Sequence, residues 1–257
     1  MILYYALGRW MDIDPKAETS RRFSPYIYAL NNPVYFIDPD GMQADDWRIN
    51  YTDANGKSQS FMFDGTQTVL PDNQFVRDFV GAYNYNVSNG GGQAMQAIAA
   101  NDIIVDVQQG EYNKQEGDTG KFAYNQVTWN PAAGLETTTG NILSPATILE
   151  HEADHALKFA AMPNTQKNDM AKNDAKYENK EGKRVIQGKE QTTAKANGEI
   201  TSGSITRDNH RGQRVYTTSP TSNKVDRSKT YNFIESLSNN GIYSPGFGIE
   251  DIEKYRP

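Results

Sequence analysis

The alternation of apolar and polar positions in the first part of the chain predicts a hairpin followed by a helix. Residues 46–51 and 58–63 have the period of a strand, and Asn55-Gly56 between them is a strong hairpin-turn sequence. Between residues 73 and 85 the apolar positions recur at helical spacing instead. These positions are Phe75, Val76, Phe79, Val80 and Tyr83. The segment therefore predicts an amphipathic helix packed on a β-hairpin.

The middle of the chain predicts more strands around a short helix. An Ala-rich helix is expected at 93–100, after the glycine break at 90–92. Residues 103–107 are typical of a buried strand, and residues 122–129 alternate like a strand. The segment 110–120 between them is polar and predicts a loop.

The most clearly marked helix follows Ser144. Serine is a favourable N-cap, and Pro145 suits the first helical position. The apolar pattern continues to Ala161, and Pro163 predicts the end of the helix.

The chain after this helix is mostly polar. Residues 163–183 predict a loop, and a second helix is expected from about 184 to 197. Gly198 lies where a glycine commonly ends a helix. The last 59 residues give few signals.

Composition narrows the function classes. The chain has 257 residues and a formal net charge of −6, and an acidic surface disfavours nucleic acid as a partner. It has no cysteine, which excludes disulfides, thiolate metal sites and cysteine nucleophiles. No apolar stretch is long enough to span a membrane, and the first residues lack the basic region of a signal peptide. If the protein is exported, the signal is therefore expected on a larger precursor, or the export machinery is specialised.

Residues 1–42 differ from the rest of the chain in amino-acid composition and in pattern. Tyr, Pro and Asp recur between short apolar pieces, which predicts strands broken by turns. The sequence GRWMDIDP…SPYIYALNNPVYFIDPDGM resembles the end of the Rhs/YD-repeat-associated core, a β-shell that encloses a toxin and cuts itself from it. The resemblance implies that Asp14 and Asp38 form the aspartyl pair and that the cut follows Met42. It also implies a boundary, with a variable toxin domain in residues 43–257.

The predicted helix after Ser144 contains an HExxH motif. On one helical face, His151 and His155 can bind a single Zn²⁺, and Glu152 beside them can act as a general base. Zinc would polarise an amide carbonyl and acidify the attacking water. Because the motif has apolar neighbours, the histidines are expected to be partly buried and to need polar partners. The motif therefore predicts a zinc-dependent peptidase.

A catalytic zinc site normally has three protein ligands and one open position. No histidine follows His155 at the metzincin spacing, which leaves a gluzincin arrangement with a glutamate from the later helix. The candidates are Glu178, Glu181, Glu190 and Glu199. Glu190 is favoured because small residues, Gly188 and Ala194, permit close helix packing around it. Glu181 is the alternative, although at a helix start it can simply serve the helix dipole.

A second resemblance concerns residues 181–199. They are similar to the EExxVIxGxE…A…GE stretch of zincin-like toxin domains that follow Rhs cores. Gly182 replaces the second glutamate of the pair, which weakens Glu181 and favours Glu190 as the zinc ligand.

The remaining histidine, His210, has two interpretations. It could hydrogen-bond the oxyanion, as a second histidine does in gluzincins, or it could be an ordinary exposed loop residue. Tyr216 is a weaker candidate for the same catalytic task.

Together these patterns predict an α+β, zincin-like metallopeptidase domain at 43–257, preceded by a short β-rich remnant. The predicted function is a secreted or delivered zinc endopeptidase that cleaves a protein in a target cell, with a cognate immunity protein implied by the resemblance. In zincins the substrate backbone pairs with a strand edge above the active helix, and residues 122–129 are expected to provide it.

Two alternatives stay open. One is a non-enzymatic binding module with a degenerate HExxH, supported by the missing metzincin ligand and by Asp154, a charged residue where zincins usually have none. Asp154 is otherwise expected to face solvent or a neighbouring Lys or Arg. The other alternative is a zinc-dependent hydrolase with a different substrate.

Overall fold

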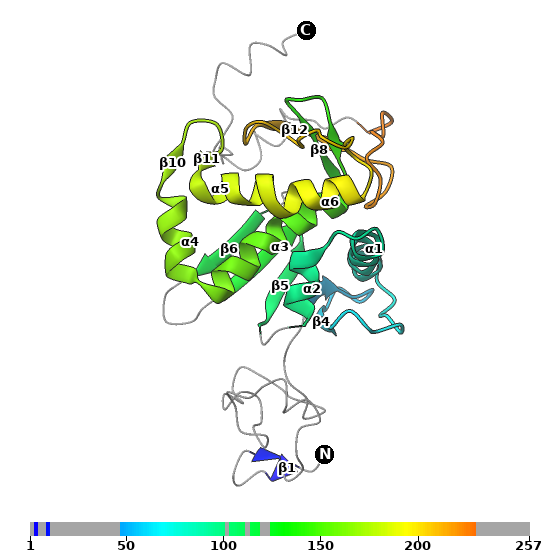
Figure 1. Cartoon of the computed structure of the whole chain (residues 1–257). Coiled ribbons are helices and arrows are strands. Elements are labelled where there is room, and N and C mark those ends of the chain that lie inside the picture. The colour runs from blue at the N-terminus through cyan, green and yellow to red at the C-terminus, as the bar shows by residue number, and fades with distance from the viewer. Residues whose placement is uncertain are drawn as a thin grey trace.

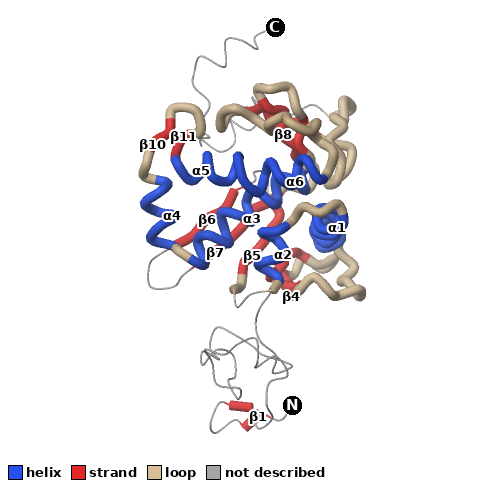
Figure 2. Tube along the Cα trace, viewed as in Figure 1, coloured by secondary structure: helices blue, strands red, loops and turns tan. Residues whose placement is uncertain are grey.

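The computed structural model describes residues 47–100, 103–110, 114–118 and 124–229, together with a two-residue strand pair near the start. That pair consists of β1 (Leu3–Tyr4) and β2 (Arg9–Trp10). Asp14, Asp38 and Met42 lie outside the described residues, as does the chain beyond 229. The described part mixes helices and sheets, as expected for an α+β protein (Figures 1 and 2).

The main sheet has five strands in the order β4-β3-β5-β7-β6. Its central strands β3, β5 and β7 are parallel, while β4 and β6 pair antiparallel at the two edges. The strands are β3 (Trp47–Thr52), β4 (Ser58–Phe63), β5 (Val105–Gln109), β6 (Lys114–Asp118) and β7 (Tyr124–Trp129). The predicted hairpin is confirmed, with Gly56 at φ 77° in its turn.

Two expectations about this sheet are wrong. Segment 110–120 contains strand β6, which is defined by its pairing with β7 and shows no apolar alternation that would have predicted it. In addition, β7 is paired on both sides, by β5 and β6, so the described part of the expected strand, residues 124–129, does not provide a free edge. Of the described strands, the edge strand beside the helix predicted after Ser144 is β6.

Three helices pack on the sheet to form the main core. They are α1 (Gln74–Ser88), α2 (Gln93–Ala99) and α3 (Pro145–Ala161). All five apolar positions predicted for α1 are buried, and Trp47, Phe79 and Trp129 lie within the same core. The helix predicted after Ser144 is confirmed at both ends, and the Ser144 hydroxyl accepts a hydrogen bond from the Thr147 amide at 3.2 Å.

Buried polar groups fix α3 within this core. The Trp129 indole donates to the Pro145 carbonyl at 2.9 Å, and the Asn125 amide donates to the Ala156 carbonyl at 2.8 Å. The Glu150 carboxylate accepts the backbone amides of Ala94 and Met95 at 2.8 and 3.1 Å. The helix that carries HExxH is therefore held at its start, in the middle and near its end.

A second run of helices crosses α3 (Figure 1). It comprises α5 (Lys180–Val185), the π-helical turn η2 (Ile186–Glu190) and α6 (Gln191–Ala196). The predicted helix therefore exists but begins four residues earlier, at Lys180, because Asn179 caps it by accepting the Gly182 amide at 2.8 Å. Gly198 follows it at φ 71°, as expected for a residue beyond a helix end.

The prediction of a loop at 163–183 is wrong for most of that segment. It contains α4 (Pro163–Met170) and a small hairpin of β10 (Asn173–Asp174) and β11 (Glu178–Asn179). Ionic contacts order this polar segment, since Asp169 lies 2.9 Å from Lys158 and 3.0 Å from Lys180. Beyond the helices, β8 (Ala133–Thr137), β9 (Ile142–Leu143) and β12 (Gly212–Tyr216) form a three-stranded sheet.

Candidate metal centre

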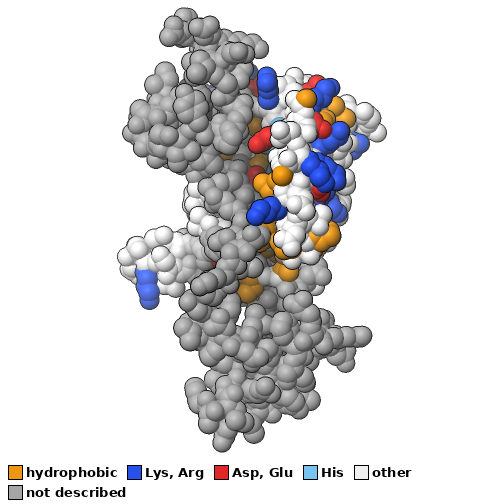
Figure 3. All heavy atoms as spheres, turned by 90° about the vertical axis from the view of Figure 1, so that its left-hand side faces the viewer, with side chains coloured by type: hydrophobic (Ala, Val, Ile, Leu, Met, Phe, Trp, Pro, Cys, Tyr) orange, Lys and Arg blue, Asp and Glu red, His pale blue; other side chains and the backbone are white. Residues whose placement is uncertain are grey.

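Helix α3 brings together the three residues of the motif. His151 and Glu152 are buried, and His155 is mostly buried. The rings of His151 and His155, one turn apart, meet edge-on with their centroids 4.9 Å apart. A small area of histidine surface reaches the outside of the molecule among acidic and basic side chains (Figure 3). The expected burial of the histidines is confirmed, and each has a polar partner.

The partner of His151 is Glu190 from the crossing helix. One carboxylate oxygen of Glu190 lies 2.7 Å from Nδ1 of His151. Arg207 binds the same carboxylate through two nitrogens, with Nε 3.1 Å from Oε1 and Nη2 on Oε2. Although burial opposes the charged form, Arg207 and His151 lower the pKa of Glu190 to about 2. Glu190 is thus an ionised carboxylate in a fully buried position.

The partner of His155 is Glu181, in an arrangement similar to that of His151 with Glu190. Oε1 of Glu181 lies 3.1 Å from Nδ1 of His155. Arg184 and Lys158 also bind this buried carboxylate, at 2.7 Å each. Burial opposes ionisation here too, but the hydrogen bonds from His155, Arg184 and Lys158 hold the pKa of Glu181 well below its usual range.

These contacts determine the tautomer of both imidazoles. An ionised carboxylate can only accept, so the contacts with Glu190 and Glu181 assign the proton to Nδ1 of each ring. At His151 this contact, at 2.7 Å, outweighs the longer one of 3.4 Å from Nη2 of Arg207, which can only donate. A neutral imidazole then has its lone pair on Nε2. Burial lowers the pKa of His151 to about 3, which keeps that ring neutral. Within the described part of the chain, no hydrogen bond or ion pair uses Nε2 of either ring.

Asp154, which departs from the usual zincin pattern, is buried beside the site. Its carboxylate lies 2.8 Å from Nη1 of Arg184, and Arg184 also donates to the Asp154 carbonyl at 3.2 Å. Asp154 was expected to face either solvent or a neighbouring Lys or Arg, and in the structure it faces Arg184. Arg184 therefore joins Asp154 to Glu181 and supports the partner of His155.

His210 lies next to the motif although it is distant in sequence. Its ring centroid is 6.4 Å from that of His151, and its Nδ1 lies 3.3 Å from a carboxylate oxygen of Glu178. Burial, with Arg207 and His155, lowers the pKa of His210 to about 4. The side chain remains about one-third exposed.

The other candidates are distributed as follows. Glu199 is buried near Ser144 and Thr147, and Tyr216 lies on β12. Among the described residues, no three His, Asp or Glu side chains already stand close enough to hold one metal ion together. Glu190 as the third zinc ligand, with Glu181 as the alternative, stays a prediction.

Sequence reasoning missed the basic residues of the site. Lys158, Arg184 and Arg207 each contact a carboxylate that faces a motif histidine. One signal was present in retrospect, because Arg184 lies one turn after Glu181, at the i+3 spacing of a helical ion pair. Arg207 lies in a loop, where no periodicity points to a partner.

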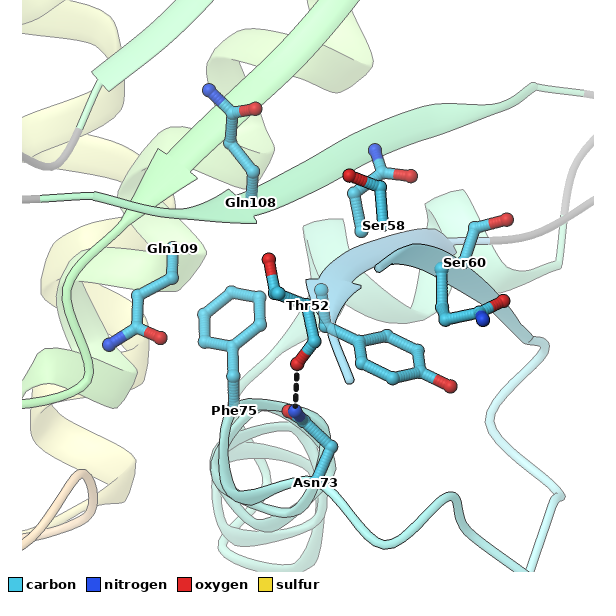
Figure 4. Close-up of a pocket in the computed structure, with 10 residues that line it drawn as sticks. Thr52, Ser58, Ser60, Asn73, Phe75, Gln108 and Gln109 are labelled. Carbon is cyan, nitrogen blue, oxygen red and sulfur yellow. Dashed lines mark hydrogen bonds between the residues drawn. The ribbon is translucent and has the colours of Figure 1, made fainter. Parts of the chain in front are cut away.

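A polar pocket of about 630 Å³ lies apart from these residues, at the carboxyl ends of β3 and β5 (Figure 4). Its lining residues carry no charged side chain: Asn50, Tyr51, Thr52, Ser58, Gln59, Ser60, Asn73, Phe75, Gln108 and Gln109. Two of these residues are hydrogen-bonded to each other, since the Asn73 side-chain amide donates to the Thr52 carbonyl at 3.0 Å. Without an acid, a base or a charge, this lining supports no step of the predicted chemistry.

Within the described residues no helix is long and apolar enough to cross a membrane. Comparison with protein-family models, with curated proteins and with solved structures gives no match for this chain.

Proposed function

We propose that this chain is a zinc-dependent endopeptidase whose metal is held by His151 and His155. One observation carries the proposal: the two imidazoles lie one turn apart on α3, and each is held through Nδ1 by an ionised carboxylate. Carboxylate–imidazole pairs of this kind orient metal-binding histidines and raise their basicity. Zinc prefers neutral imidazole nitrogen, so the donors fit this metal.

The reaction follows from the residue between the two histidines. Zinc, when bound, supplies a Lewis acid for the peptide carbonyl and the attacking water. Glu152 is the general base: its carboxylate takes a proton from the water as the water oxygen bonds to the carbonyl carbon. The same carboxyl then gives that proton to the amide nitrogen as the C–N bond breaks. Burial of Glu152 keeps this exchange away from bulk solvent.

An extended peptide is the substrate class that the fold favours. Strand β6 is the edge of the main sheet that lies against α3, and its outer side has no strand partner among the described residues. A substrate backbone can add to such an edge as an antiparallel strand, which would bring one peptide bond over the helix. Strand β6 replaces the expected segment 122–129 as the proposed substrate-binding edge, because β7 (Tyr124–Trp129) is paired on both sides.

The biological setting is proposed from sequence alone. Residues 1–42 resemble an Rhs core end, which supports a toxin released after Met42 by Asp14 and Asp38 and neutralised by an immunity protein. Producing residues 43–257 inside bacterial cells tests this setting. Growth arrest by the wild type but not by Glu152→Gln would support a toxic peptidase, and equal growth of both would contradict it.

The enzymatic proposal is tested with purified full-length protein and added zinc. Incubation with a mixture of denatured proteins, followed by mass-spectrometric detection of new N-termini, should show cleavage by the wild type. Glu152→Gln should keep its zinc and lose about 10²–10⁴-fold in rate, the usual contribution of a general base. Cleavage of small amides but not proteins would favour another zinc hydrolase, and equal zinc-free activity of both proteins would contradict the proposal.

A further inference from the structure

All three histidines of the chain have a glutamate carboxylate near Nδ1, hydrogen-bonded at His151 and His155 and at ion-pair distance, 3.3 Å, at His210. Nδ1 of His151 faces Glu190, Nδ1 of His155 faces Glu181, and Nδ1 of His210 faces Glu178. The three carboxylates belong to one continuous segment, from β11 through α5 to η2. Each imidazole is thus approached by a carboxylate on its Nδ1 side, which leaves Nε2 as the nitrogen that can bind a ligand.

The backbone around His210 is built to bring its ring close to the motif. The His210 amide donates to the Lys176 carbonyl at 2.9 Å, which ties its loop to the β10–β11 hairpin. Its ring then lies over Gly182, where an added Cβ would stand 3.2 Å from the ring carbon Cδ2 and 2.7 Å from the Tyr177 carbonyl oxygen. Only glycine leaves this approach open.

Glu178, which faces His210, is held in an unusual conformation. Its φ is 68°, and it is the one residue other than glycine with a positive φ in the described part of the chain. A residue with a side chain is disfavoured in this region relative to the right-handed one, because its Cβ approaches the following carbonyl oxygen. Such strain persists where surrounding structure or function demands it, which agrees with a placed carboxylate.

The chemistry distinguishes two roles for His210. A neutral imidazole has one N–H, and a carboxylate 3.3 Å from Nδ1 of His210 favours that nitrogen as the one that keeps the proton, which leaves the lone pair on Nε2. A lone pair binds a metal ion, but it cannot donate to a developing oxyanion. The arrangement therefore favours a ligand over the oxyanion donor expected from the sequence.

Glu190 is poorly placed to be the third ligand. Its carboxylate lies on the Nδ1 side of the His151 ring, whereas a metal held by Nε2 would lie on the opposite side. Arg207 also occupies both of its oxygens. Glu181 is likewise placed, on the Nδ1 side of His155 and bound by Arg184 and Lys158.

We propose that His210 is the third zinc ligand, and that Glu190, Glu181 and Glu178 are positioning residues for the three imidazoles. This inference rests on the proposed zinc function. Imidazoles on one tetrahedral zinc have ring centroids roughly 5 Å apart. The His151–His155 pair has this spacing at 4.9 Å, and His210, at 6.4 Å from His151, must approach by roughly 1.5 Å when zinc binds.

The direct test is X-ray absorption spectroscopy of the full-length wild-type protein loaded with zinc. Imidazole gives a characteristic multiple-scattering pattern, so the number of histidine ligands can be fitted. Three imidazoles support the inference. Two imidazoles with a protein carboxylate overturn it while leaving the zinc site intact. Absence of zinc uptake overturns both this inference and the proposed function.

Zinc affinity, measured by competition with a chromogenic chelator, gives an independent readout. Glu190→Gln and Glu178→Gln should each weaken binding about 10–100-fold, as is usual for residues that orient a ligand. His210→Ala should weaken it more than either glutamate variant, with one imidazole fewer in the absorption spectrum. Arg211→Ala, the exposed neighbour, is the matched control and should bind like the wild type. Unchanged affinity and imidazole count in His210→Ala would overturn the inference.

Discussion

The Glu190 carboxylate lies 2.7 Å from Nδ1 of His151, although 39 residues separate them along the chain. The contact joins the π-helical turn of the crossing helix to the middle of α3. Because the Glu190 side chain is inaccessible to solvent, its charge depends on protein partners, and Arg207 is the cationic one. The chain of contacts from His151 through Glu190 to Arg207, called here the His–Glu–Arg cluster, therefore contributes to the stability of the fold as well as to the candidate site.

Removing the Arg207 cation from the His–Glu–Arg cluster should lower the free energy of unfolding. Arg207→Met leaves the buried Glu190 charge without its main partner, and loss of one partner of a buried ion pair typically costs about 3–5 kcal/mol. Chemical denaturation at neutral pH measures the change in the free energy of unfolding. The double variant Glu190→Gln/Arg207→Met removes both charges and should be more stable than Arg207→Met alone. A loss below about 1 kcal/mol in Arg207→Met would contradict the role of this pair.

A methyl group at position 182 should disturb the approach of His210. Gly182→Ala places Cβ 2.7 Å from a backbone oxygen and 3.2 Å from the His210 ring, so we expect a loss of about 1–3 kcal/mol in the free energy of unfolding. Gly81→Ala, in α1, is the control because no atom lies within 4 Å of its added Cβ. That variant should gain up to about 1 kcal/mol from helix propensity. Similar effects of the two substitutions would show that position 182 is not constrained.

Glu199 should make the stability of the protein depend on pH. Neither of its buried carboxylate oxygens has a hydrogen-bond partner in the described structure. Burial raises its pKa to about 7, despite the opposing effect of the nearby Ser144 and Thr147, whose hydroxyl groups stop short of hydrogen-bond geometry. The folded state thus keeps a proton that the unfolded state, in which the ordinary pKa of 4.5 applies, releases. The free energy of unfolding should therefore fall as pH rises from about 4.5 to 7.

The measurement compares urea denaturation of the wild type and Glu199→Gln across this pH range. The wild type should lose on the order of 2 kcal/mol relative to the variant between pH 4.5 and 7. Other carboxylates titrate in both proteins, so the difference between the two curves isolates Glu199. Parallel curves would mean that Glu199 titrates normally in the folded protein.

Local signals in the sequence predicted the elements that form by local rules. The hairpin at Asn55-Gly56 and the helix after Ser144-Pro145 are confirmed, because turn and cap preferences act over a few residues. The HExxH spacing also predicted that His151 and His155 share one helix face, which the edge-on contact of their rings confirms.

Elements stabilised by distant charges could not be predicted in this way. Helix α4 has little apolar surface, and its Asp169 depends on Lys158 and Lys180 from other helices. Strand β6 is defined by its pairing with β7 and not by its own pattern. Likewise, Glu181 and Glu190 were recognised as site residues, but the Nδ1 atoms that they face and the cations that bind them depend on how the helices cross.

The central claim, a zinc ion held by the α3 histidines, is tested most directly by elemental analysis of zinc in the purified protein. The wild type and Glu152→Gln should each contain one zinc ion per chain, since the base is not required for binding. His151→Gln and His155→Gln should contain almost none. A wild-type protein that holds no zinc when freshly purified, and takes up none on titration, would contradict the account and favour a binding module with a degenerate motif.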